Sequence, residues 1–522
     1  MFPCEAMLLI SGKVGLRQTR YDSVLIKTSL CSLLSLYMPL LYAASGQEIA
    51  TSLKDNLQGV FTPKSDDHFN KVDLKQLSNF DVDTSKFDEL PVIGSTHSNT
   101  VNTGGLSLVS PTSRTLDISE AVKIAVQRHP EISQNIASLA SQNANIDVAK
   151  AAYYPQLSGG ISTGDMTSGE RGRQLLSLNA TQMVYDFGKV KSSVDIQKAR
   201  LALQQAQVLV KIDEVALEVA SAIVNLKRYE EVCRIAQQQV DGIARIAEIA
   251  NLRANAGISS QADPVQAKSY LEASQSNLIA QQTQLRLYQQ KLRTLLGFDI
   301  SRINWKIPEN VVTESKIFEA PKINTIPTIM SAQAEVNVAK AQKTQTDLSR
   351  YPTLNLVGTL SQALNGVNPN NNKDDGFDSS IKFEASSNFF QGGSVGAQSR
   401  AASYAEEAAK AKVQNSYMDI LEQIRMTEEQ VTNKQRQMQV LVARQSTTTR
   451  TKELYQEQYK LGTRTVVDLL NAEQAIHSAN MEIENNRYDI YANLVQLIST
   501  TGQSRDVYHL NRLSIQGVEV QP

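Results

Sequence analysis

The sequence has few aromatic residues, few cysteines and almost no net charge. Only 6% of its 522 residues are aromatic, Trp305 is the single tryptophan, and the formal net charge at pH 7 is −1. The near-zero charge argues against nucleic acid as a partner. Ala, Gln, Ser, Leu and Glu dominate instead, a composition typical of long, weakly hydrophobic helices rather than of a thick mixed core.

Motifs for catalysis and metal binding are also missing. The five histidines are scattered without a His-Glu-x-x-His pair, and the sequence has no Gly-x-Ser-x-Gly elbow. His129 and His477 each lie alone on a helical pattern, which does not indicate a metal site. We therefore predict a protein that is not an enzyme and that holds no cofactor and no metal.

Residues 1–45 have the features of a secretory signal peptide. Basic residues precede an apolar run over 30–44, and small residues at 43–46 offer a cleavage site. A buried helix is the alternative for this run, and initiation nearer Met7 would shorten the long basic region. Removal of the signal would leave Cys233 as the last of three cysteines, so we expect it to pack and to form no intrachain disulfide.

The residues after the signal contain no membrane-spanning helix. Residues 46–115 are rich in Ser, Thr, Asp, Asn and Gly and show no period, which predicts a flexible extension. No later stretch has ~20 consecutive apolar residues. An exported chain of this kind is either soluble or a β-barrel.

Residues 116–297 alternate between helical and strand patterns. Two helical patterns run to about Ala152, broken at His129-Pro130, and the second stops before Pro155. Residues 154–187 then change to a period of two, which predicts a hairpin of two ~10-residue strands. Its polar side carries Ser, Asn and Thr, and its apolar side carries Leu157, Ile161, Leu176, Leu178 and Val184. That length suits a tilted strand that crosses a membrane.

Two long helices complete this unit. The pattern from Gly188 to about Leu252 is uninterrupted, and Gly257 ends it. A returning helix runs from Asp263 to Leu296. Heptad spacing in the first of these helices predicts coiled-coil packing. One seam contains Val208, Val215, Ala222, Ile243 and Ala250, and the other contains Ile212, Val219, Leu226 and Cys233.

The same order of elements occurs again over residues 325–503. Tyr351-Pro352 repeats Tyr154-Pro155 about 197 residues later, at the start of a second hairpin over 351–391. Beyond that hairpin the offset is about 205, so the second hairpin loop is about eight residues longer while the helices keep their lengths. We predict an internal duplication, with a linker over 298–324 and a tail over 504–522.

Each copy has a Gly-x₅-Asp turn between its two long helices. The first turn runs from Gly257 to Asp263 and the second from Gly462 to Asp468. Thr463 or Thr465 can cap the helix that follows the second turn. The simplest role for both aspartates is to stabilise helix N-termini through the dipole.

The strand count requires more than one chain. Four amphipathic strands cannot close a membrane barrel, because the smallest barrels have about eight. An open sheet in lipid would leave unpaired edges. Two chains would supply eight strands and three would supply twelve. The long helices start at Gly188 and Gly393, directly after strands, so they would extend a barrel as a helical tube with the Gly-x₅-Asp turns at its remote tip.

Several motifs together resemble the TolC family of outer-membrane efflux and secretion channels. They are Ala121-Val122 followed after seven residues by Pro130, the two Tyr-Pro-x-Leu strand starts, Phe390-Gln-Gly-Gly393, and Tyr459-x-x-Gly-Thr-Arg-Thr-Val-Val-Asp468. The resemblance implies an α+β membrane protein that forms a homotrimer. Its twelve-stranded transmembrane β-barrel, with four strands per chain, is continued by a long periplasmic α-helical barrel. The implied partners are outer-membrane lipid, a periplasmic adaptor, and an ABC or proton-driven inner-membrane transporter.

The resemblance also implies a gate at the periplasmic tip. Tyr459 and Arg464 match a tethering tyrosine and arginine, Asp263 matches the aspartate that they contact, and Asp468 matches a ring aspartate. Two positions depart from the family pattern. Ala262 stands where a hydroxyl can assist the tether, and Asn471 stands where a second aspartate can occur, which would weaken a cation block.

Two alternatives remain open at this point. The channel could serve type I protein secretion or multidrug efflux, and the sequence does not identify the cargo. The chain could instead be an exported coiled-coil adaptor or scaffold without a pore. Paired strands with a lipid-like face argue against a scaffold, which would not need them.

Overall fold

The computed structural model describes residues 115–164, 173–300, 303–307, 317, 319, 322–368, 370–374, 376–387, 390–515 and 518–519. The predicted signal peptide and all but the last residue of the predicted extension lie outside the described residues, as do much of the linker and part of the tail.

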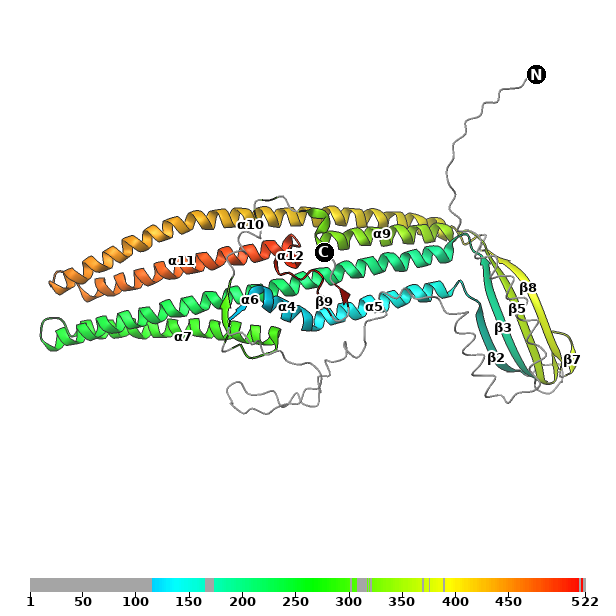
Figure 1. Ribbon diagram of the computed structural model, residues 1–522, viewed down its shortest axis with the longest axis horizontal. Helices are drawn as coiled ribbons and strands as arrows, with labels where there is room; N and C mark the ends of the chain where they lie inside the picture. Colours follow the sequence, from blue (N-terminus) through cyan, green and yellow to red (C-terminus); the bar gives the residue numbers. More distant parts are fainter. Residues whose placement is uncertain are drawn as a thin grey trace, which may run out of the picture. The chain divides into compact units, whose positions relative to one another are not determined.

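Three pairs of helices have matching lengths (Figure 1). Helices α5 (Pro130–Ala151) and α9 (Pro327–Leu348) each have 22 residues. Helices α6 (Lys189–Asn255) and α10 (Ser394–Lys460) each have 67, and α7 (Ala262–Leu296) and α11 (Val466–Thr500) each have 35. The expected equality of helix lengths is confirmed.

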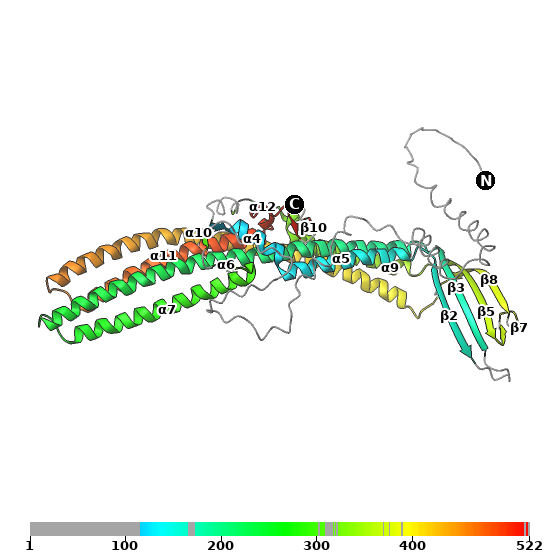
Figure 2. The same cartoon turned by 60° about the horizontal axis from the view of Figure 1, so that its bottom comes forward.

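Glycines and prolines set the ends of these helices. Gly188 and Gly393 adopt positive φ directly before α6 and α10, and Gly257 and Gly462 do so after them. Pro130 and Pro327 begin α5 and α9, where a missing N–H is tolerated. In Figures 1 and 2, α7 lies along α6 and α11 lies along α10. No helix in the described ranges is both long and apolar enough to cross a membrane.

Four strands form one antiparallel sheet in the order β2-β3-β5-β8. They are β2 (Gln156–Gly164), β3 (Arg173–Tyr185), β5 (Thr353–Asn365) and β8 (Phe377–Ser386). The central pairing of β3 with β5 joins the two hairpins into a single sheet. The predicted hairpins are therefore present, and each begins one residue after its Tyr-Pro pair.

The two faces of the sheet differ as the alternation predicts. The register pairs Ile161 with Leu176, Leu178 with Leu360, and Leu356 with Phe383, so these side chains share one face. All six are exposed in the isolated chain. On the opposite face the hydroxyls of Thr359 and Ser380 meet at 2.6 Å. A sheet with one exposed apolar face needs a covering, and the described residues do not supply one. Asn388 and Phe389, which fall within the predicted second hairpin over 351–391, lie outside the described residues.

The longer loop of the second hairpin holds a short ladder that the sequence did not predict. It consists of β6 (Val367–Asn368) and β7 (Lys373–Asp374). Asn368 is fully buried, and its amide donates hydrogen bonds to the carbonyls of Ser361 and Gly376 at 3.2 and 2.8 Å. The loop is thus anchored to the polar face of β5.

Helix α6 is the centre of the helical core. It packs against α4 (Ile118–Arg128), α5, α7, α9 and α11. Twenty-four of its residues are buried, against six in α10, although both helices have the same length. The predicted seams are buried at most positions, but Cys233 is only partly covered. Burial on α6 extends beyond two seams because both repeats pack on it.

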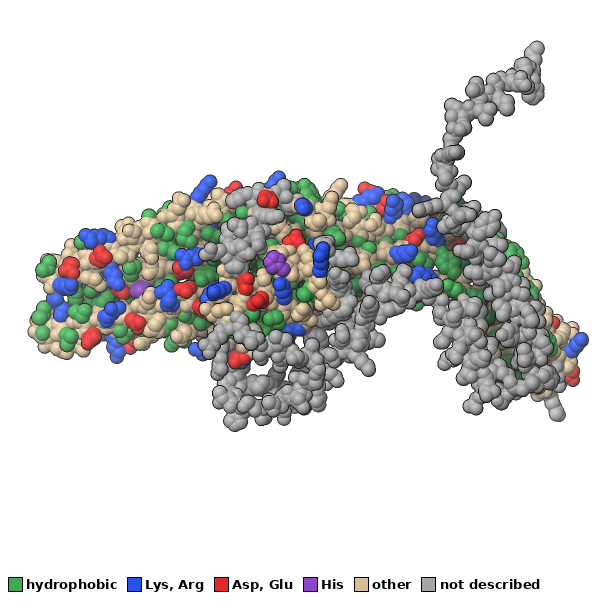
Figure 3. All heavy atoms as spheres, in the orientation of Figure 1, with side chains coloured by type: hydrophobic (Ala, Val, Ile, Leu, Met, Phe, Trp, Pro, Cys, Tyr) green, Lys and Arg blue, Asp and Glu red, His purple; other side chains and the backbone are tan. Residues whose placement is uncertain are grey.

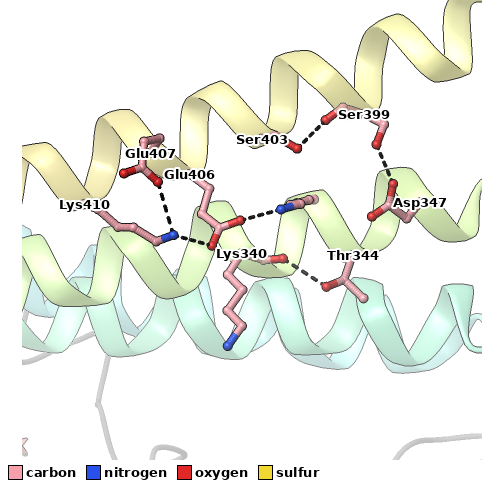
Figure 4. A network of polar contacts seen from close by, with 9 residues as sticks. Lys340, Thr344, Asp347, Ser399, Ser403, Glu406, Glu407 and Lys410 are labelled. Carbon is pink, nitrogen blue, oxygen red and sulfur yellow. Dashed lines mark hydrogen bonds and ion pairs between the residues drawn. The ribbon is translucent and has the colours of Figure 1, made fainter.

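The N-terminal part of α10, which follows the sheet, makes polar contacts with α9 (Figure 4). Glu406 pairs with Lys343 of α9 at 2.9 Å and with Lys410 at 3.0 Å, and these hydrogen bonds lower its pKa. Ser399 donates to Asp347 at 2.6 Å. Along the helices, Figure 3 shows Lys and Arg side chains interspersed with Asp and Glu.

Short segments pack against the middle of the long helices. Strand β1 (Thr115–Asp117) pairs in parallel with β4 (Asn304–Lys306), and this pair buries Trp305. Leu116 therefore lies in a strand, and the predicted helix begins after its Asp117 cap. The remaining short elements are η2 (Ile323–Thr325), α12 (Ser504–Val507), β9 (Ser514–Ile515) and β10 (Val518–Glu519).

Candidate functional site

The second Gly-x₅-Asp turn is closed by a reciprocal cap. Thr465, one of the two predicted caps, is the N-cap of α11, and its hydroxyl accepts from the Asp468 N–H at 3.2 Å. The Asp468 carboxylate in turn accepts from the Thr465 N–H at 3.3 Å and from its hydroxyl at 2.8 Å. These hydrogen bonds, with a smaller contribution from Arg464, lower the pKa of Asp468. Thr463 instead donates to the carbonyl of Gln458 at the end of α10.

The first turn has no equivalent cap. The Ala262 N–H donates to the Ser260 hydroxyl at 3.1 Å, and the Asp263 N–H donates to the Ser260 carbonyl at 3.1 Å. Asp263 lies in the first turn of α7, where its charge favours the helix dipole. Its carboxylate forms no box of the kind seen at Asp468.

Arg464 contacts only its own helix pair. Its guanidinium lies over the Tyr455 ring at 4.4 Å, its Nε donates to Gln458 at 3.0 Å, and its Nη1 lies 3.9 Å from the Asp468 carboxylate. Within the described chain, no hydrogen bond or ion pair joins Arg464 to Asp263. The fold thus brings Arg464 to Asp468 and does not bring it to the first turn's aspartate.

Tyr459 is buried under an arginine that the sequence reading missed. The Arg253 guanidinium lies 4.8 Å from the centre of the Tyr459 ring, and its Nη1 donates to the Tyr459 carbonyl at 3.3 Å. The Tyr459 hydroxyl makes no hydrogen bond within the described residues. Burial raises the pKa of this hydroxyl, the Arg253 charge opposes that shift, and the Asp263 charge adds to it. A basic residue in the last turn of α6 was the signal that could have identified Arg253.

Asn471 links the two repeats at the tip. Its side-chain oxygen accepts a hydrogen bond of 2.9 Å from the Tyr270 hydroxyl on α7. Tyr270 was not predicted as a site residue, because nothing local to position 270 indicates a partner 201 residues away.

A buried carboxylate lies just beyond these turns. Glu473 on α11 is 3% exposed, and it pairs with Lys452 of α10 at 2.6 Å and with His477 at 3.1 Å. Burial acts to raise its pKa, but the hydrogen bonds from His477 and Lys452 outweigh burial and hold the pKa below its ordinary value. His477 is therefore paired rather than alone. No cluster suited to a metal ion occurs among the described residues.

The strand starts lie at the opposite end of α6. The Tyr351 ring stacks on Phe187 at 5.3 Å, and Phe187 meets Tyr185 edge-on at 4.8 Å. Tyr154 and Tyr351 each precede the proline that directs the chain into its strand. This aromatic group lies at the junction of the sheet and the helices.

Known proteins share this arrangement. The family model described as outer membrane efflux protein matches residues 121–298 and 324–503. The outer membrane protein TolC of Escherichia coli (strain K12) is 23% identical over 449 residues, which cover 80% of this chain and 89% of that protein. BepC, an outer membrane efflux protein of Brucella suis, is 20% identical over 442 residues, 81% of this chain and 91% of BepC.

Solved outer-membrane channels share the fold. VceC of Vibrio cholerae has a TM-score of 0.64 at 17% identity, over 74% of this chain and 96% of VceC. The CmeC channel of Campylobacter jejuni has a TM-score of 0.63 at 15% identity, over 79% of this chain and 94% of CmeC. These relatives are channel proteins, in keeping with a protein that is not an enzyme. The protein is located in the outer membrane and extends into the periplasm. The chain belongs to the outer membrane efflux protein family, the family of TolC.

Proposed function

We propose that this protein is the outer-membrane exit channel of a tripartite export system, a passive trimeric conduit. One observation carries the proposal. The four-stranded sheet exposes an apolar face, and its outer strands β2 and β8 each have one unpaired edge among the described residues. Three copies joined edge to edge give a closed barrel of twelve strands, which removes the edges and places the apolar face against lipid.

The helices continue this barrel into the periplasm. Helix α10 exposes many apolar side chains in the single chain, among them Met418, Met426, Val440, Val442 and Leu454. Neighbouring copies would cover this face and complete an α-helical barrel. The domain assignment follows: a signal peptide over 1–45, an extension over 46–115, efflux repeats over 116–297 and 325–503 joined by the linker 298–324, and a tail over 504–522.

The proposed gate lies at the two helix turns. Gly257 and Gly462 form the turns, Tyr459 and Arg464 act as the tether towards Asp263, and Asp468 and Asn471 face the aperture. Support comes from Arg464, whose side chain is 40% exposed and whose ion pair with Asp468 is long, at 3.9 Å, so that little opposes its reach to a neighbouring copy.

A periplasmic adaptor docks on this channel, and an inner-membrane ABC or proton-driven transporter supplies the energy. The cargo is a secreted protein in the first case and small molecules in the second. Capture of the channel from membranes, followed by identification of the transporter that accompanies it, separates the two.

The gate is tested by the variant Tyr459→Phe with Arg464→Glu. We expect single-channel conductance in planar bilayers to rise several-fold, because the tether is lost and the introduced carboxylate would repel Asp468. Arg450→Glu is the matched control, since Arg450 lies exposed on the same helix pair and pairs with Glu453 one turn away. Unchanged conductance in the double variant would contradict the proposed tether.

The pore itself has a separate test. A trimeric barrel migrates differently on gels before and after boiling and conducts ions in bilayers. A chain that fractionates with the periplasm and gives no current would instead be the coiled-coil adaptor or scaffold.

A further inference from the structure

Glu473 lies where three helices of the two repeats meet. It belongs to α11, its Oε2 lies 2.6 Å from the Lys452 Nζ on α10, and its Oε1 lies 3.1 Å from the His477 Nε2. Both carboxylate oxygens are therefore held, and the side chain is 3% exposed. Roughly 7 Å of helix separates it from Asp468, five residues earlier on α11.

The third helix contributes a glycine. Gly242 lies inside the 67-residue helix α6, where glycine is a poor helix former. A Cβ built on Gly242 would overlap the Glu473 Oε1 and lie 2.8 Å from its Cδ. The absence of a side chain at position 242 thus leaves the space that the carboxylate occupies, and the distance between α6 and α11 is set at this contact.

The contact adjoins the proposed gate through a cavity. A cavity of about 320 Å³ between α6, α10 and α11 extends from Gly242 and Glu473 to Tyr459. Arg245, Arg253 and Lys460 line it together with Lys452, and Glu473 is the one acid among its lining residues. Leu469, also in its wall, packs with Tyr459 in one apolar cluster. A change in the α6–α11 distance therefore reaches the buried face of Tyr459 directly.

We propose that Glu473, seated against Gly242 and held by Lys452, positions α11 on α6 and thereby keeps the tip closed. This inference rests on the proposed gate. Glu473 acts through Tyr459 and the turn rather than on the aperture, so it is a positioning residue. Opening requires the carboxylate to leave its seat, which is unfavourable because it would break the contacts with Lys452 and His477 and leave both of these side chains without their acidic partner.

The first repeat supplies the matched control. At the offset of 205, Glu473 corresponds to Lys268 and His477 to Glu272. Lys268 and Glu272 lie 3.9 Å apart with side chains 74% and 65% exposed. Lys268→Ala therefore removes a charge, of the opposite sign, at the equivalent position, where the side chain is exposed and not held in a buried contact, and we expect wild-type conductance.

The test is a double-mutant cycle on the full-length channel, with single-channel conductance as the readout. Gly242→Ala blocks the seat and Glu473→Ala empties it, and each should raise conductance about twofold or more. The combined variant should conduct no more than Glu473→Ala alone, because the added methyl then enters vacated space. Strictly additive effects, or wild-type conductance in both single variants, would overturn the proposal.

A second comparison tests the proposal even if the Gly242→Ala variant does not assemble. Glu473→Gln keeps the shape at Gly242 and loses the ion pair, so its conductance should fall between wild type and Glu473→Ala; equal conductance in all three overturns the proposal. The outcome is separable from the proposed gate. If Tyr459→Phe with Arg464→Glu opens the channel but Glu473→Ala does not, only the positioning role fails, and if the wild type carries no current, the channel itself fails.

Discussion

The two tip turns have the same geometry and different chemistry. Gly257 and Gly462 both have positive φ, at 70° and 75°, and each is followed after five residues by an aspartate in the first turn of a 35-residue helix. Only the second turn has a capping box. The duplicated scaffold keeps the backbone conformation of the turn, while specific side-chain interactions gather in one copy.

The difference between the copies is complementary. The second repeat supplies the side chains that insert, Tyr459 and Glu473, and the first supplies what receives them, Arg253 and Gly242. If the two repeats were identical in sequence, each would carry the same residues at these positions, and one repeat could not supply the inserted side chain while the other supplies the space for it. The divergence of the repeats therefore holds the two helix pairs together at the tip.

Removal of the Tyr459 side chain should have the largest effect on the packing of the two helix pairs at the tip. Tyr459→Ala empties a buried site between Arg253, Val466 and Leu469, and a large-to-small change there costs about 3 kcal/mol. Hydrogen exchange at the start of α11 should speed up by about 100-fold if opening is local. Tyr404→Ala, on an exposed part of α10, should leave exchange unchanged. Equal exchange in both variants would show that the second tip does not depend on Tyr459.

Loss of the cap should have the next largest effect. Thr465→Ala removes the hydroxyl that accepts from the Asp468 N–H, which costs about 1 kcal/mol. Ser260→Ala in the first turn should cost a few tenths, since Ser260 forms no reciprocal box. Hydrogen exchange in the first turns of α11 and α7 measures both, and equal losses would erase the difference between the turns.

The link between Tyr270 and Asn471 should contribute less. Tyr270→Phe removes one exposed hydrogen bond between α7 and α11, worth about 0.5 kcal/mol. Asn471→Asp keeps an acceptor for the Tyr270 hydroxyl and adds a negative charge, so stability should change little while block of the channel by divalent cations increases. Conductance measured with and without added divalent cation checks the second effect. A block no stronger than in wild type would contradict the proposal that residue 471 faces the aperture.

The smallest expected effect is on pH dependence. The pKa of Asp468 is lowered below its ordinary value of 3.8, so the cap is fully present above that value and is lost as pH falls through the lower, folded-state pKa. Protection from exchange at the start of α11, measured relative to the intrinsic exchange rate at each pH, should fall with acidification in that range, and Asp468→Asn should remove the response. A response of the same size in the variant would assign the titration to another group.

Local patterns predict most of the fold. A period of two, Tyr154-Pro155 and Tyr351-Pro352 located the hairpins, and the positive-φ glycines located the turns. Contacts between distant segments were not predictable in this way. The β1–β4 pair, the seat of Glu473 on Gly242 and the stacking of Arg253 on Tyr459 join residues about 190 to 230 positions apart, and no periodicity records which residue faces which.

The candidate site was predictable to the same extent. Thr465 and Asp468 were identifiable because a cap acts within four residues. Asp263 and Arg464 lie in the turns as expected, but no hydrogen bond or ion pair joins them within the described chain, so the proposed tether would have to form between neighbouring copies. Glu473 was overlooked because an acid on a helical pattern is usually solvated.

The burial of α6 from both repeats bears on how the protein is made. The chain is synthesised from its N-terminus, and α11 follows the end of α6 by about 210 residues. Until then Gly242, Ile243 and Ile246 have no partner from the second repeat, so the half-made protein presents an apolar strip to the periplasm. The nascent first repeat is consequently the form most in need of a chaperone, and termination after residue 297 should give a product that proteases remove faster than the full chain.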